Sequence, residues 1–150
     1  MAKKPIYRAG LVPYILHENQ TIEILTMKPS NPKFGGDDFQ IAKGKIEEDE
    51  TAKDAALREA HEELGLHPKA LKKVYELGMF LGKSTFFVGK IKTTFCSGEV
   101  ITKYELEEPH FETGETKWMT TEEFIKFGRR IHVPIVKAAV RLIKEKEGLF

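Results

Sequence analysis

Cysteine is almost absent from this chain: Cys96 is the single one among 150 residues. One cysteine cannot form an internal disulfide or supply a cysteine metal cluster, which agrees with a reducing compartment, and we expect the protein to be cytoplasmic. Long hydrophobic runs are missing too, both near Met1, where a secretory signal would need one, and wherever a membrane span would need one. The sequence therefore predicts a protein with no membrane partner.

An excess of charge of one sign is also lacking. The chain has 24 Lys and Arg residues against 23 Asp and Glu, a formal net charge of +1. Such a balance gives no general attraction to nucleic acid, which we do not expect as a partner. No repeat, low-complexity tract or linker interrupts the sequence, and 150 residues with 41% hydrophobic content suit one globular domain over residues 1–150.

The pattern of hydrophobic residues predicts strands and helices in a mixed order, with the segment "KPSNPKFGGDD" as a loop. Strands are expected at Tyr7–Leu16, Thr21–Met27, Phe39–Ala42, Val74–Leu81, Ser84–Ile91, Val100–Leu106 and Glu115–Met119. Helices are expected at Thr51–Leu64, from Thr120 or Thr121 onward, and at Val133–Glu147. The fold class is therefore α/β, a mixed sheet covered by helices on both faces.

Acidic residues concentrate on the first of these helices. Glu59, Glu62 and Glu63 stand at i, i+3 and i+4, so the turn of a helix places them on one face. Like charges at this spacing repel, unless a cation lies among them or some are protonated. Oxygen ligands of this kind favour Mg²⁺, Mn²⁺ or Ca²⁺ over Zn²⁺. The segment therefore predicts a site for a divalent cation.

A solvated charged face is the alternative explanation for these acids. Small alanines argue against it, because Ala52, Ala55 and Ala56 project into the same sector of the helix as the glutamates. That side of the helix is thus expected to lie close against the protein, with the carboxylates pointing into a cleft.

The spacing around these acids resembles a known family motif. Gly44, five residues, Glu50, seven residues and then "REAHEELGL" at 58–66 match the Nudix box, G-x5-E-x7-R-E-U-x-E-E-x-G-U with U aliphatic. The resemblance implies a Nudix α/β/α sandwich that hydrolyses a nucleoside diphosphate linked to another moiety, with Mg²⁺ or Mn²⁺ as cofactor. Outside the strict box, Ala42 and Asp49 replace a proline and a glycine that relatives often carry.

The resemblance also implies roles for single residues. Glu50 matches a glutamate that assists the site, and Arg58 matches an arginine that orients the acids by ion pairing. The side chains of Lys43 and Lys45 are expected to meet phosphate. The implied metal ligands are the backbone carbonyl of Lys43 and the carboxylates of Glu59, Glu62 and Glu63, the last being the main catalytic acid.

A further acid is expected from the later segment "HFETGETKW". Glu112, six residues before Trp118, looks like the downstream base or metal ligand of several Nudix subfamilies, including diadenosine polyphosphate hydrolases. Glu115 is the alternative, and either could be an ordinary solvated acid. Some side chains could stack on a base or line a pocket, although for most of them the core is the favoured place: Tyr7, Arg8, Phe39, Phe80, Phe86 and Phe111. Of these, Arg8 and Phe39 are expected to bind substrate.

Several readings of the function stay open at this point. The first is a pyrophosphohydrolase acting on dinucleoside polyphosphates, ADP-ribose or nucleotide sugars, and another is the same chemistry on nucleoside triphosphates or RNA 5′ ends. A Nudix-fold module that senses nucleotides without cleaving them is a third. Basic residues near the last helix are better explained by a solvated outer face than by nucleic-acid binding. Nudix proteins frequently form homodimers.

Overall fold

The computed structural model describes residues 5–31, 33, 37–96, 99–102, 106–110 and 112–149. Phe111, a pocket candidate from the sequence, lies outside this part of the chain. The strands are β1 (Arg8–Leu16), β2 (Ile22–Pro29), β3 (Ala42–Lys45), β4 (Leu71–Phe80), β5 (Ser84–Ile91), β6 (Thr93–Cys96), β7 (Glu99–Thr102) and β8 (Thr113–Met119). The α-helices are α1 (Ala52–Leu64), α2 (Thr121–Phe127) and α3 (Val133–Glu147), and two short 3₁₀ helices are η2 (Pro68–Ala70) and η3 (Arg130–His132).

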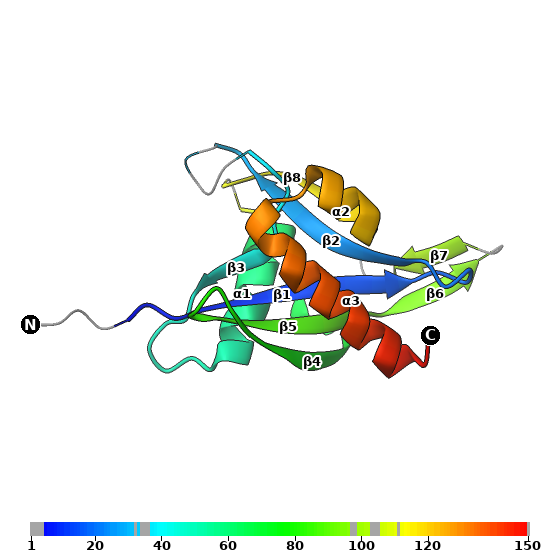
Figure 1. The fold of residues 1–150 in the computed structure, drawn as a ribbon, viewed down its shortest axis with the longest axis horizontal. Helices are drawn as coiled ribbons and strands as arrows, with labels where there is room; N and C mark the ends of the chain where they lie inside the picture. Colours follow the sequence, from blue (N-terminus) through cyan, green and yellow to red (C-terminus); the bar gives the residue numbers. More distant parts are fainter. Residues whose placement is uncertain are drawn as a thin grey trace, which may run out of the picture.

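The main sheet has six strands and a divided centre (Figure 1). Its order is β4-β5-β1-β2-β8, with β1 parallel to β5 and the other pairs antiparallel. The other edge of β1 is shared: its first half pairs with β3, from Arg8 with Lys45 to Leu11 with Ala42, and its last residues pair with β2. The sheet is therefore mixed, and β3 brings a short strand into its centre.

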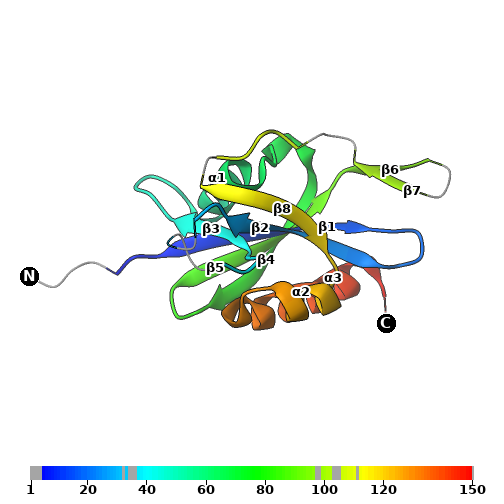
Figure 2. The same cartoon turned by 90° about the horizontal axis from the view of Figure 1, so that it is seen from above.

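Helices cover the two faces of this sheet, α1 on one side and α2 with α3 on the other (Figure 2). Alternation along β1 explains both layers, because Ala9 and Leu11 point into the core under α1 whereas Val12 and Tyr14 point into the core under α3. All four are fully buried. The predicted α/β/α sandwich is confirmed.

Most predicted elements occur near their expected bounds, and the expected range of α3 is matched at both ends. The strand predicted at Phe39–Ala42 is wrong, because the ladder with β1 begins at Ala42 and continues to Lys45. Phe39 and Gln40 make only isolated bridges, to Gly128 and Met27. Of the strand expected at Val100–Leu106, the structure describes β7, which ends at Thr102 and pairs with β6, while 103–105 lie outside the described residues.

None of the described helices is long and apolar enough to cross a membrane.

Candidate active site

Helix α1 has a defined beginning and end. The hydroxyl of Thr51 accepts a hydrogen bond from the backbone N–H of Asp54 at 3.1 Å, which caps the first turn. Gly65 ends the helix in the left-handed conformation, with φ of 70°. A Cβ atom at Gly65 would lie 1.8 Å from the backbone oxygen of Glu107, so only glycine fits between the helix end and that segment.

The inner face of α1 consists of small residues. Ala55, Ala56 and Ala60 are buried there and allow the helix to lie close to β1 and β3. The closest approach is at Gly44 of β3, where a Cβ atom would lie 2.1 Å from Cδ of Glu59. The Glu59 carboxylate therefore occupies the space that a side chain at position 44 would need, which explains why glycine is required in the strand.

Arg58 ties the helix to the segment that precedes it. Its Nε and Nη2 donate to the two carboxylate oxygens of Glu50, at 2.8 and 3.0 Å, and Nη1 donates to Glu59 at 2.9 Å. Nη2 also donates to the backbone oxygen of Lys45, at 3.0 Å. The hydrogen bond from Arg58 lowers the pKa of Glu50, and the same pairing raises the pKa of Arg58. Arg58 thus joins the loop to the Glu59 carboxylate through ion pairs.

Glu59 and Glu63 form a close pair of carboxyl groups with little access to solvent. The Glu59 side chain is 13% exposed. Burial, followed by the charge of Glu59, raises the pKa of Glu63 to about 9, and burial also raises the pKa of Glu59, against the lowering effect of Arg58. Two such groups are stable side by side only if a proton or a cation lies with them. Their hard oxygen atoms fit a divalent cation such as Mg²⁺ or Mn²⁺.

Glu62 lies differently from these two acids. Its side chain is 49% exposed, and one carboxylate oxygen is 3.5 Å from Nη1 of Arg58. It is near enough for its charge to raise the pKa of Glu59. Within the described ranges, no three His, Cys, Asp or Glu side chains converge closely enough to hold a metal ion by themselves. The structure therefore brings two of the three predicted glutamates together and leaves the third beside them on the arginine.

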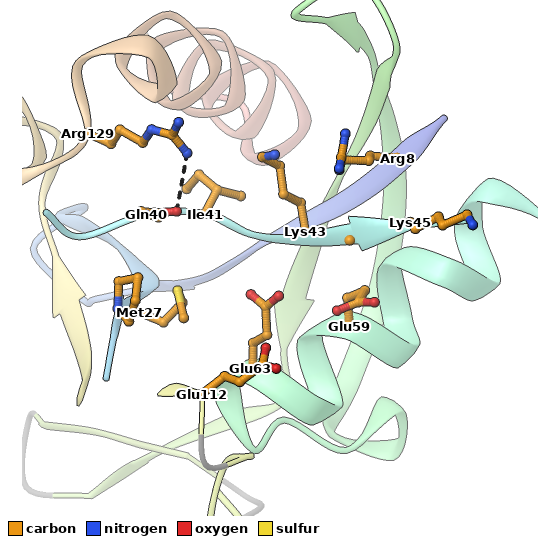
Figure 3. Close-up of a pocket in the computed structure, with 12 residues that line it drawn as sticks. Arg8, Met27, Gln40, Ile41, Lys43, Lys45, Glu59, Glu63, Glu112 and Arg129 are labelled. Carbon is orange, nitrogen blue, oxygen red and sulfur yellow. Dashed lines mark hydrogen bonds between the residues drawn. The ribbon is translucent and has the colours of Figure 1, made fainter. Parts of the chain in front are cut away.

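A cavity of about 430 Å³ lies between α1 and the strands β1, β2 and β3 (Figure 3). Glutamates line one wall and cationic side chains line the opposite wall. The acidic wall is made by Glu59, Glu63 and Glu112, the basic wall by Arg8, Lys43, Lys45 and Arg129, and the remaining lining by Met27, Pro29, Gln40, Ile41 and Gly44.

Six of the predicted site residues line this cavity, and four do not. Glu112 lines it, whereas its alternative, Glu115, does not. Phe39 is 9% exposed and packs in the core under α3, so the structure does not place its ring in the cavity. Phe86 is likewise buried in the core. The six that line it are Arg8, Lys43, Lys45, Glu59, Glu63 and Glu112, and the four outside are Phe39, Glu50, Arg58 and Glu62.

Arg129 is the charged residue of the cavity that the sequence did not predict as a site residue. It belongs to the basic stretch that was interpreted as a solvated outer face, yet it lines the cavity and its Nη1 lies 3.5 Å from Oε1 of Gln40. No local motif marks it, because its place depends on a contact with a remote segment: the backbone N–H of Arg129 donates to the oxygen of Phe39 at 2.7 Å. The isolated bridge between Phe39 and Gly128 holds the same two segments together.

Comparison with known proteins identifies the family. A family profile described as the NUDIX domain matches residues 7–141, which is most of the chain. The chain therefore belongs to the Nudix family. Among curated proteins, none matches this sequence.

Solved structures with the same fold include three that the chain resembles over nearly its whole length. An Ap4A hydrolase from C. elegans, in a binary complex, is 20% identical, with a TM-score of 0.65 and coverage of 94% of this chain and 99% of that one. A mutT/nudix family protein from Listeria innocua is 18% identical, with a TM-score of 0.67 and coverage of 97% and 98%. The NUDIX domain of Shewanella oneidensis NrtR, crystallised with ADP ribose, is 15% identical, with a TM-score of 0.63 and coverage of 95% and 90%.

Proposed function

We propose that this chain, acting as one domain over its whole length, is a divalent-cation-dependent pyrophosphohydrolase. Its substrate is a nucleoside diphosphate linked to another moiety, as in dinucleoside polyphosphates, ADP-ribose and nucleotide sugars. Water attacks one phosphorus atom and the bridging P–O bond breaks, which leaves a mononucleotide and a phosphorylated second product. The observation that carries the proposal is the half-buried pair of Glu59 and Glu63 across one cavity from cationic side chains.

The acidic wall would hold the cation. Glu59 and Glu63 are its central ligands, and the backbone carbonyl of Lys43 and the carboxylates of Glu62 and Glu112 complete the proposed set. A bound Mg²⁺ or Mn²⁺ supplies charge neutralisation at the phosphate oxygens and a lowered pKa for a bound water. Glu112, which is exposed at the cavity, either adds an oxygen ligand or accepts the proton of the attacking water.

Arg58 and Glu50 position these groups without touching the substrate. Arg58 holds the carboxylate of Glu59 in place, and Glu50 completes that pairing from the preceding loop. Arg8 and Lys43 line the cavity with positive charge, which suits the phosphate groups of a nucleotide, and Lys45 lies at its edge with the ammonium group turned outward (Figure 3). Structures with the same fold include an Ap4A hydrolase and an NrtR domain crystallised with ADP ribose, so this fold accommodates nucleotides of both kinds.

The experiment is product analysis over a panel of diadenosine polyphosphates, ADP-ribose, nucleotide sugars, FAD, nucleoside triphosphates and RNA with a 5′ triphosphate. Native protein, Glu63→Gln and the matched control Glu76→Gln are each assayed with Mg²⁺ or Mn²⁺. Glu76 is an exposed glutamate of β4 outside the cavity. Cleavage by the native protein and the control, lost in Glu63→Gln, is the expected result, and the ranking of substrates identifies the class.

Two other outcomes would replace this proposal. Preference for nucleoside triphosphates or RNA 5′ ends would keep the chemistry and change the substrate. Nucleotide binding without turnover by the native protein would make the chain a sensing module. The retained carboxylate pair argues against a sensing module, because a site that only binds an anion gains nothing from two buried acids facing it.

A further inference from the structure

Three cationic side chains of the cavity come from segments far apart in the sequence. Arg8 begins β1, Lys43 lies in β3, and Arg129 precedes η3. All three line the cavity, and Figure 3 shows Lys43 between the two arginines. We call Arg8, Lys43 and Arg129 the cation cluster.

The members of the cation cluster act on one another. After burial itself, the charges of Arg8 and then Arg129 are the largest causes that lower the pKa of Lys43, and the opposing effect of Glu63 is smaller. Burial lowers the pKa of His132, and the charges of Lys43 and Arg129 lower it further. Positive charge is therefore concentrated at this end of the cavity, on the side away from the carboxylate pair.

No ion pair within 4.0 Å joins a member of the cluster to an acid of the described chain, although Arg58, Lys28 and Lys90 all have such partners. Arg129 instead meets the neutral amide oxygen of Gln40, at the long distance of 3.5 Å. Lys43 and Arg129 are half-buried and Arg8 is exposed, and like charges this close cost free energy unless an anion lies among them. Arginine is also the side chain best suited to bind phosphate through two parallel hydrogen bonds.

The backbone under Arg129 is fixed. Its N–H donates to the oxygen of Phe39 at 2.7 Å, and its own oxygen accepts from the N–H of His132 at 2.9 Å. His132 in turn accepts at Nδ1 from the N–H of Ile41, at 3.1 Å, and it is fully buried. The segment that carries Arg129 is thus attached to the residues just before β3, which carries Lys43, so the backbone positions of these two cations are fixed relative to each other.

We propose that Arg129, together with Arg8 and Lys43, binds a phosphate group beyond the two that flank the cleaved bond, so that this cluster favours substrates with three or more phosphates in a row. The proposal rests on the proposed pyrophosphohydrolase function. Arg129 is then a specificity residue outside the Nudix box, and it favours substrates with long phosphate chains over two-phosphate substrates such as ADP-ribose.

The test compares Arg129→Gln with Arg130→Gln, a matched control at the next residue, which is exposed and outside the cavity. Titration calorimetry without divalent cations measures binding of inorganic tripolyphosphate and pyrophosphate. Steady-state assays measure kcat/KM for diadenosine tetraphosphate and ADP-ribose. We expect Arg129→Gln to lower the affinity for tripolyphosphate and the kcat/KM for diadenosine tetraphosphate about tenfold, which is the size of one charged hydrogen bond. The affinity for pyrophosphate and the kcat/KM for ADP-ribose should fall by less than about threefold. Arg130→Gln should change none of them.

Equal losses on long and short phosphate chains, or no loss on either, would overturn the proposal. Arg129→Lys is the second variant, because it keeps the charge and lacks the planar fork, and it should recover part of the lost affinity. Binding of tripolyphosphate is measured without turnover, so it tests the phosphate site independently of the enzymatic function. If the native protein cleaves no nucleotide yet Arg129→Gln selectively weakens tripolyphosphate, the enzymatic function is wrong and the phosphate site is right.

Discussion

The acidic and basic walls of the cavity are built in opposite ways. Glu59 and Glu63 project from one helix, and Arg58, at the preceding position, cross-links that helix to Glu50. The basic wall has no common element, since Arg8, Lys43 and Arg129 come from three separate segments. The two carboxyl groups lie side by side with little access to solvent, whereas the cations lie close enough to repel one another and form no ion pair with an acid among the described residues.

This difference assigns separate tasks to the two walls. A pair of buried carboxylates on a rigid helix provides a cation site of fixed geometry, on which a reaction step depends. Cations that come together from separate segments at a partly open site provide affinity for anions and select among them. Changes to the acidic wall should therefore lower turnover, and changes to the basic wall should alter binding and substrate ranking.

Glu63→Gln should give the largest fall in turnover and should distinguish most clearly the role of the acidic wall from that of the basic wall. Loss of a buried cation ligand should remove several kcal/mol of transition-state stabilisation, a fall in kcat of about 10³-fold. Binding of inorganic tripolyphosphate without divalent cations should be kept, because the cation cluster is unchanged. Parallel assays of turnover and calorimetry measure the two properties, and equal losses in both would mean that the walls are not separable.

Arg58→Lys tests whether the acidic wall depends on its cross-link. Lysine cannot reproduce the fork that meets both oxygens of Glu50, so Glu59 loses its fixed partner. We expect kcat to fall by about 10- to 100-fold with little change in KM, as for other residues that orient metal ligands. The free energy of unfolding from urea titration should fall by about 1 kcal/mol, because the pair is partly exposed. A change confined to KM would contradict the positioning role.

Gly44→Ala adds one methyl group between β3 and the side chain of Glu59. The new Cβ would lie 2.1 Å from Cδ of Glu59, so the carboxylate must move. Because the displaced atoms are the end of a side chain, the melting temperature should change little, while kcat falls about tenfold. Native activity in this variant would mean that the observed position of Glu59 does not matter for turnover.

His132 should give the smallest effect, through stability. Burial, with the charges of Lys43 and Arg129, lowers its pKa to about 3. The folded pKa lies below the usual value near 6.5, so the unfolded chain binds more protons between these limits, and the stabilisation present above pH 6.5 is lost as the pH falls toward 3. From pH 7 to pH 6 this residue should lower the free energy of unfolding by about 0.7 kcal/mol.

Urea titrations of the native protein and His132→Asn at both pH values measure that contribution. Asparagine retains an acceptor for the N–H of Ile41, and it does not titrate. The variant should therefore show a smaller loss over this interval. Identical losses would mean that His132 is not held neutral beneath the basic wall.

The contrast between the walls also explains how far the sequence could predict the site. Helix α1 was predictable because its cap, its alanines, its spaced acids and the closing Gly65 all lie within one segment. Arg58 and Glu50 are eight residues apart and belong to the same motif. Local chemistry alone was enough to place these groups together.

The basic wall was only partly predictable, because tertiary pairing decides it. The contact between Arg129 and Phe39 joins residues remote in sequence, and the same pairing puts the Phe39 ring into the core instead of the cavity. The strand predicted at Phe39–Ala42 was misplaced for a similar reason. β3 begins at Ala42 because the first half of β1 is its partner, and a hydrophobic pattern does not reveal which partner a strand will find.

The most direct test of the central claim is titration with Mn²⁺ followed by electron paramagnetic resonance, which needs no knowledge of the substrate. Native protein, Glu63→Gln, Arg129→Gln and Glu76→Gln would be compared. The account predicts that affinity for Mn²⁺ falls at least about tenfold in Glu63→Gln and is unchanged in the other two variants. Equal affinity in all four proteins would contradict it, because the buried carboxylate pair would then not be the cation site.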